Sequence, residues 1–240
     1  MFNRIPHVVK NLLIINALFF VAMYAVGYQF DFDMTKHFAL YYPSSQHFRP
    51  YQFVTYMFMH GGIMHIFFNM YALLIFGAAI ENAWGGKRFF TYYMVCGIGA
   101  GIIQVFVIGI RIYFISKNIP QEAVQIVYEN GANILTEGKN YFGAMGELNI
   151  LLNTSTVGAS GAVFGILLAF GMMYPNAQLM LLIPPVPIKA KWLVIGYGAL
   201  ELFLGFSQPG SNIAHFAHLG GMLFGFLLIR YWIAQARRRD

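Results

Sequence analysis

Residues 158–174 read GASGAVFGILLAFGMMY, a stretch with no charged residue and with one serine, Ser160, near its start. Pro175 follows and cannot continue a helix in the usual form. A helix of about 17 residues is ~25 Å long, shorter than the ~30 Å hydrocarbon core of a bilayer. If its C-terminal end is anchored near Pro175, its N-terminus lies below the opposite membrane surface. The stretch therefore predicts a short membrane-spanning helix with a serine at its slightly buried N-terminus.

The composition of the whole chain agrees with a membrane location. Of the 240 residues, 58% are hydrophobic and 10% are charged, whereas soluble domains average about half apolar and a quarter charged. Runs near the ~20 apolar residues that a bilayer requires cover residues 11–28, 63–84, 89–115, 158–174, 191–206 and 213–235. The first run lacks a small-residue cleavage site, so we expect a retained helix and not a signal peptide. We expect an all-α, polytopic bundle of six transmembrane helices in one domain, residues 1–240.

The basic residues lie in short groups between the apolar runs and predict the topology. An even number of spans puts both termini on one side of the membrane. That side receives Arg4, Lys10, Lys87, Arg88, Lys189, Lys191, Arg230 and Arg237 to Arg239, and the other receives Lys36, Arg49, Arg111, Lys117 and Lys139. Because cytoplasmic loops carry the excess of Lys and Arg, we expect both termini in the cytoplasm. This bias explains the net charge of +6, so we exclude nucleic acid as a partner. We find no targeting presequence and expect a bacterial plasma membrane.

Ser160 has two interpretations. Gly161 and Gly165 have the spacing of a helix-packing face, and serine is common at such contacts. Alternatively, the hydroxyl takes part in chemistry, because unpaired N–H groups and the positive end of the helix dipole favour negative charge on a nearby oxygen. Taken alone, this motif favours packing.

The sixth run supplies a possible partner for the serine. Residues 212–225 read NIAHFAHLGGMLFG, with His215 and His218 near the start, followed by Gly221-x-x-x-Gly225. This helix and the serine helix are expected to begin on the same side, and their glycine faces could bring them into close contact. A histidine within hydrogen-bond reach could remove the serine proton during attack. The alternative is a buried, hydrogen-bonded histidine between helices, although intramembrane ionisable residues are usually functional.

A third cluster lies at the start of the second run, where residues 60–70 read HGGIMHIFFNM. His65 and Asn69 are four residues apart and therefore share one helix face. Two donors on a face near the serine could hold the oxygen that becomes negative when a carbonyl is attacked. The alternative is an interhelical hydrogen bond of ~1 kcal/mol. Because all three clusters fall at the same depth, their coincidence favours a catalytic site.

Together, these motifs resemble those of rhomboid intramembrane serine proteases. The resemblance rests on Gly158-x-Ser160-Gly161, on Ala217-His218-x-x-Gly221-x-x-x-Gly225 and on His65-x-x-x-Asn69, each in the expected one of six spans. Weaker matches are Gly77-x-x-x-Glu81 and Phe48-Arg49.

The resemblance implies that Ser160 is the nucleophile and His218 the general base, with no aspartate completing a triad. It implies an oxyanion hole made of His65, Asn69 and the backbone N–H of Ser160, with Gly158 keeping the turn before the serine tight. The supporting residues are Phe164, His60, His215, Gly161, Gly221 and Gly225. It further implies cleavage of the transmembrane segments of other membrane proteins near the outer face, without metal or cofactor. The oligomeric state stays open.

Two positions depart from the family pattern. Rhomboids commonly have tyrosine four residues after the serine, stacked on the catalytic histidine, whereas this chain has Phe164. The first-loop motif usually reads tryptophan-arginine, whereas here Phe48 precedes Arg49. Neither change removes a catalytic atom, so we expect an active enzyme.

Three further features lie around this pattern. Residues 116–156 are expected to form a loop with some short helix on the outer surface, and an insertion without function is the simpler interpretation, because long loops cost little. We expect His60, Gln208, Ser211, Asn212 and His215 to provide the polar lining through which water enters. The fifth run and the loop after it form a plausible lateral gate, and for Glu201 within that run we find no catalytic role.

Two alternatives stay open. His60, His65, His215 and His218 could collect zinc, because imidazoles suit that ion, but the chain lacks a His-Glu-x-x-His helix, and its single cysteine, Cys96, excludes an internal disulfide and a cysteine cage. A non-catalytic rhomboid-like protein that binds transmembrane helices would be expected to lose the serine or the histidine, and both are present.

Overall fold

The computed structural model describes residues 5–30, 32–180, 185–208 and 214–238. Its elements are α1 (His7–Phe30), α2 (Met34–Phe38), α3 (Gln52–Thr55), η2 (Tyr56–Phe58), α4 (Ile63–Ala72), η3 (Leu73–Gly77), α5 (Ala78–Trp84), α6 (Gly86–Lys117), α7 (Gln121–Thr136), α8 (Gly143–Asn153), α9 (Ser160–Met173), β1 (Gln178–Met180), β2 (Pro187–Lys189), α10 (Ala190–Ser207) and α11 (His215–Arg237). Strands β1 and β2 pair antiparallel. Arg4, Arg239, Ser211 and Asn212, which entered the sequence predictions, lie outside the described residues.

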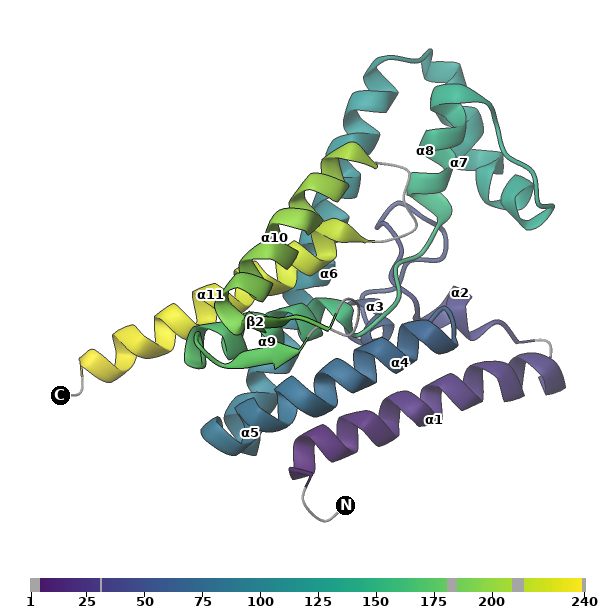
Figure 1. Ribbon diagram of the computed structural model, residues 1–240. Helices are drawn as coiled ribbons and strands as arrows, with labels where there is room; N and C mark the ends of the chain where they lie inside the picture. The colour runs from purple at the N-terminus through teal and green to yellow at the C-terminus, as the bar shows by residue number, and fades with distance from the viewer. Residues whose placement is uncertain (1–4, 31, 181–184, 209–213, 239–240) are drawn as a thin grey trace.

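The expected helical bundle is confirmed (Figure 1). Among the described segments, α1, the run α4–η3–α5, α6 and α11 are long and apolar enough to cross a membrane, and α9 is a shorter apolar helix. Helix α10 has 18 residues and carries Lys191 and Glu201. Large apolar side chains are exposed along these helices, where lipid can cover them; they include Leu18, Val21, Phe67, Phe68, Ile102, Phe106, Ile195, Phe203, Leu223 and Leu227.

Helix directions alternate along the chain. The starts of α4, α9 and α11 therefore share one end of the bundle with the ends of α1, α6 and α10. We call this end, where Ser160 and His218 lie, the site end. The connection between α5 and α6 at the other end is a single residue, Gly85, whose φ of 79° lets α5 stop and α6 begin immediately.

Helices α6, α9 and α11 form the centre of the bundle. The glycine faces of α9 and α11 do meet: a methyl group at Gly221 would collide with the carbonyl of Gly161. Small residues let the backbones approach this closely, so dispersion contacts hold the helices together in an apolar solvent. The Tyr92 hydroxyl donates a 2.8 Å hydrogen bond to the Gly165 carbonyl, which ties α6 to α9.

The segment expected as a loop at 116–156 is more ordered than predicted. It forms two packed helices, α7 of 16 residues and α8 of 11, which stand beside the end of α6 (Figure 1). They share a second apolar core with α6, made of Ile112, Val124, Val127, Leu148, Leu151 and Leu152. The reason is that the apolar residues of each helix fall on one face. Burying that face against α6 offsets the conformational entropy lost when the chain becomes ordered.

Glu81, from the weaker motif match Gly77-x-x-x-Glu81, has a structural role. Its two carboxylate oxygens accept hydrogen bonds of 2.9 and 2.7 Å from the backbone N–H groups of Val8 and Val9. The side chain is buried, and it satisfies N–H groups that a helix start leaves without intrahelical partners. Glu81 thus fixes α1 to α5 at the end of the bundle opposite the site end.

Candidate active site

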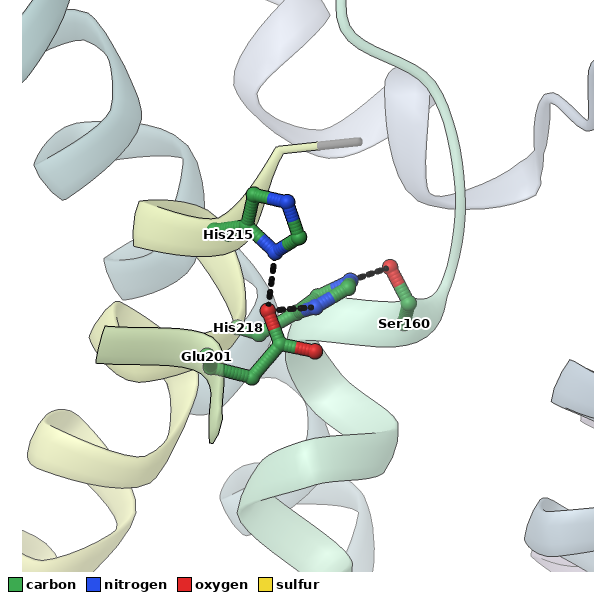
Figure 2. Close-up of polar contacts among 4 residues, drawn as sticks. All are labelled: Ser160, Glu201, His215 and His218. Atoms are coloured by element: carbon green, nitrogen blue, oxygen red, sulfur yellow. Dashed lines mark hydrogen bonds and ion pairs between the residues drawn. The ribbon is translucent and has the colours of Figure 1, made fainter. Parts of the chain in front are cut away.

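Ser160 and His218 lie in contact at the site end. Ser160 is the first residue of α9, and His218 lies in the first turn of α11. The distance from Ser160 Oγ to His218 Nε2 is 2.8 Å (Figure 2), within the range of an O–H···N hydrogen bond. Because Gly161 and Gly221 allow α9 and α11 to approach, residues 58 positions apart in the chain meet here.

The His218 ring is held from one side by an aromatic neighbour. Phe164, one helical turn after Ser160, stacks on it with ring centroids 4.2 Å apart and an interplanar angle of 3°. Phe164 in turn meets Tyr197 of α10 edge-on at 6.1 Å. The stacking surface expected at this position is therefore present with phenylalanine in place of tyrosine.

The edge of the His218 ring opposite Ser160, which carries Nδ1, faces a carboxylate. Glu201 Oε2 lies 3.0 Å from His218 Nδ1 and 2.6 Å from His215 Nδ1, as Figure 2 shows. All three side chains are buried. The spacing of residues in the sequence could not reveal this cluster, since Glu201 lies on α10 and the histidines on α11. Its one available signal was an ionisable residue inside an apolar run, which is by default a functional candidate.

This geometry does not gather the four histidines of the zinc alternative. Among the described residues, the one group of potential ligands is Glu201, His215 and His218, so His60 and His65 do not join it. Tetrahedral zinc with bonds of ~2.0–2.1 Å holds its ligand atoms ~3.3 Å apart. The 2.6 and 3.0 Å separations observed are instead those of carboxylate–imidazole contacts.

The His65 ring lies next to Gly158, in the turn that precedes Ser160. Gly158 has a φ of 124°, and a Cβ at this position would lie 2.7 Å from His65 Nε2 and 3.6 Å from Ser160 Oγ. The glycine thus leaves the space that the His65 ring edge needs beside the serine. Its N–H donates a 2.9 Å hydrogen bond to the Tyr56 carbonyl, which fixes the turn before α9. The tight turn expected at Gly158 is present.

Asn69 and His60 both contact His65, and among the described residues neither forms a hydrogen bond to Ser160 or His218. The Asn69 side chain donates a 2.9 Å hydrogen bond to the carbonyl of His65, within its own helix. His60 is buried beside His65, with ring centroids 5.1 Å apart. Burial, assisted by the neighbouring His65, lowers the pKa of this loop residue to about 4, so the imidazole of His60 is neutral at pH 7.

A cavity of about 1370 Å³ opens beside Ser160, His65 and His218. Its polar walls differ from those predicted, because Gln208, His60 and His215 do not line it. The polar lining comes from Gln104, Arg111, Asn140, Glu147, Thr154, Ser155 and Thr156. The reason is the folding of α8 over the site end, where Glu147 forms a 2.8 Å ion pair with Arg111 of α6. The α7–α8 segment, interpreted from sequence as an insertion without function, therefore forms a wall of the site.

The comparison with protein families agrees with the motifs. The rhomboid domain model matches residues 47–115 and 123–235. The chain belongs to the rhomboid family. Both matched segments include site residues, His65 in the first and Ser160, Glu201 and His218 in the second. The family resemblance predicted from the motifs is thus confirmed.

Three relatives share about a quarter of their aligned residues with this chain. Rhomboid protein 1, mitochondrial, of Saccharomyces cerevisiae is 25% identical over 179 residues, 75% of this chain and 40% of that protein. RHOMBOID-like protein 12, mitochondrial, of Arabidopsis thaliana is 28% identical over 89% of this chain and 55% of its own. Rhomboid protease AarA of Providencia stuartii is 25% identical over 72% of this chain and 52% of its own. In each case the chain spans less than two thirds of the relative's length.

Proposed function

We propose that this rhomboid-family protein is an intramembrane serine endopeptidase that hydrolyses peptide bonds in or near the transmembrane segments of other membrane proteins. The observation that carries the proposal is the 2.8 Å contact between Ser160 Oγ and His218 Nε2 beside a cavity at the site end. A relative named as a rhomboid protease supports the reaction class.

The mechanism follows from this contact. Ser160 Oγ attacks the carbonyl carbon of the scissile bond while His218 Nε2 takes the hydroxyl proton. The resulting tetrahedral intermediate expels the amine, which receives that proton from the imidazolium, and an ester on Ser160 remains. Water, deprotonated by His218, then attacks the ester and releases the new carboxyl end together with the free hydroxyl. Protons and bonds balance without a further reactant.

In this proposal, two groups stabilise the oxyanion. The N–H of Ser160 belongs to the first turn of α9, where backbone donors have no intrahelical partner and the helix dipole is positive. The ring edge of His65 adjoins the same turn across Gly158. For Asn69 to act as a third donor, its side chain must leave the carbonyl of His65, so we assign it the smaller contribution.

The surroundings support a site reached from one side of the membrane. The basic residues Lys87, Arg88, Lys189 and Lys191 lie at the end of the bundle opposite Ser160. By the positive-inside rule, we place that end and both termini in the cytoplasm of a plasma membrane. The active site then lies near the outer face, where the polar cavity walls admit water.

The proposal is tested with the full chain purified in detergent, a model transmembrane substrate and a fluorophosphonate probe for reactive serine. We expect the wild type to cut the substrate and to be labelled, and Ser160→Ala and His218→Ala to do neither. Ser44→Ala, a matched change at an exposed serine, retains both activities. His65→Ala lowers cleavage by about 10²–10³, the usual effect of losing an oxyanion donor, and Asn69→Ala lowers it less.

Equal cleavage by the wild type and Ser160→Ala would refute the proposal. Absence of both cleavage and labelling in the wild type, with retained binding of transmembrane helices, would instead favour the non-catalytic rhomboid-like protein.

A further inference from the structure

Glu201 is the feature that the dyad mechanism does not use. It lies in the interior of α10, an otherwise apolar helix after Lys191, and its side chain is buried. Burying a carboxylate is costly unless it is paired and hydrogen-bonded. The partners it has are the two histidines of α11, and one of these is the base of the proposed reaction.

The contacts form a continuous chain of four side chains. His218 presents Nε2 to Ser160 Oγ at 2.8 Å and Nδ1 to Glu201 Oε2 at 3.0 Å. The same oxygen lies 2.6 Å from His215 Nδ1. Figure 2 shows the carboxylate between the two rings, on the side of His218 away from the serine.

We propose that Glu201 is a positioning residue that completes a Ser160–His218–Glu201 triad, an inference that rests on the proposed protease function. A neutral imidazole carries its proton on one nitrogen only. A carboxylate beside Nδ1 favours the tautomer with hydrogen on Nδ1, and this leaves the lone pair of Nε2 free to accept the serine proton. The same carboxylate stabilises the imidazolium that forms during attack. The family resemblance implied a dyad with no aspartate completing a triad, and the sequence indicated no catalytic role for Glu201.

His215 orients the carboxylate. Its 2.6 Å contact is hydrogen-bonded, whereas His218 Nδ1 has no aligned hydrogen-bond partner among the described residues despite the 3.0 Å distance. Catalytic hydrogen bonds are often poorly aligned without substrate and tighten in the reacting complex. The carboxylate is therefore held in place by His215, 3.0 Å from His218 Nδ1, and a small rotation of the His218 ring would align the hydrogen bond between them.

The test compares Glu201→Gln, Glu201→Asp and Glu81→Gln with the wild type. Glu81 is the matched control: it is also a buried carboxylate, but it holds α1 at the opposite end of the bundle. The measurements are kcat and KM for a model transmembrane substrate, with kcat divided by the number of sites that the fluorophosphonate finally labels. This division removes any loss of folded protein from the comparison.

We expect Glu201→Gln to lower kcat by about 10²–10⁴ with KM unchanged, since glutamine can donate to Nδ1 and select the wrong tautomer, as happens when a triad aspartate becomes asparagine. Glu201→Asp keeps the charge at a shorter reach and gives an intermediate kcat. Glu81→Gln lowers thermal stability and leaves kcat per labelled site unchanged.

A wild-type kcat per site in Glu201→Gln overturns the triad and leaves the dyad standing, whereas cleavage by Ser160→Ala overturns the protease itself. Equal kcat values in Glu201→Gln and Glu201→Asp also overturn the triad, because the charge then has no effect. If Glu201→Gln does not fold, Glu201→Asp decides: a wild-type kcat per site refutes positioning by the carboxylate, and a reduced kcat with unchanged KM supports it.

Discussion

Gly158→Ala tests whether the turn before α9 controls the reactivity of Ser160. The native φ of 124° lies in a region that L side chains rarely adopt. In addition, the new methyl carbon would lie 2.7 Å from His65 Nε2 and 2.8 Å from His65 Cε1. The substitution therefore introduces backbone strain and a collision with a proposed oxyanion donor.

The expected size of the effect follows from these two terms. Backbone strain of this kind costs about 1–3 kcal/mol. Carbon contacts are comfortable near ~3.5 Å, so the His65 ring must retreat by roughly 0.7 Å or the turn must shift by the same amount. Because a misplacement of ~1 Å can cost 10²-fold in rate, we expect kcat/KM to fall by about 10- to 100-fold.

The assay measures thermal unfolding and the rate at which a fluorophosphonate labels Ser160. Gly138→Ala is the matched control, because Gly138 also has a positive φ, 71°, but a methyl group there meets open space. We expect both variants to lose stability and Gly158→Ala alone to label slowly. A wild-type labelling rate in Gly158→Ala would show that the approach of His65 to this turn does not matter for catalysis.

Two further substitutions test the packing around the serine and histidine. Phe164→Ala removes the ring stacked on His218 at 4.2 Å; aromatic pairs contribute about 0.5–1.5 kcal/mol beyond their buried area, so we expect labelling about tenfold slower, with Phe164→Tyr unaffected. An unchanged rate in Phe164→Ala would contradict this role. Gly221→Ala forces a methyl group against the Gly161 carbonyl and should lower the unfolding temperature, because overpacking costs about 1–3 kcal/mol. Gly196→Ala, where the methyl meets open space, should show no such loss.

The spans were predictable because lipid imposes one requirement on every crossing segment. Each must be apolar and must satisfy its backbone internally, so the run 63–84 was found with the bounds of the α4–η3–α5 segment. The glycine spacings on α9 and α11 were equally informative, since small residues at four-residue intervals mark helix contacts. From these two signals, the proximity of Ser160 and His218 could be derived.

Cross-helix contacts that lack a periodic signal could not be derived. The register of α10 against α11 decides that Glu201 faces His215 and His218, and no spacing in one helix encodes that register. The Asn69 side chain donates to the carbonyl of His65 in its own helix, and the spacing of the two residues does not reveal that bond. The polar walls of the cavity come from α6, from α8 and from the chain on either side of α8, and the position of most of them depends on how α7 and α8 pack.

The connection from α8 to α9 joins these predicted and unpredicted parts. Thr156 exchanges backbone hydrogen bonds of 2.9 and 2.8 Å with Leu40, and the N–H of Gly158 bonds to the Tyr56 carbonyl. The chain between α8 and Ser160 is thus attached to the first loop at two points within three residues. Since α8 also supplies cavity walls through Glu147, a displacement of α7 and α8 would change both access to Ser160 and the turn that orients it. The length of the segment 116–156 therefore does not make it a dispensable insertion, because its last residues position the serine.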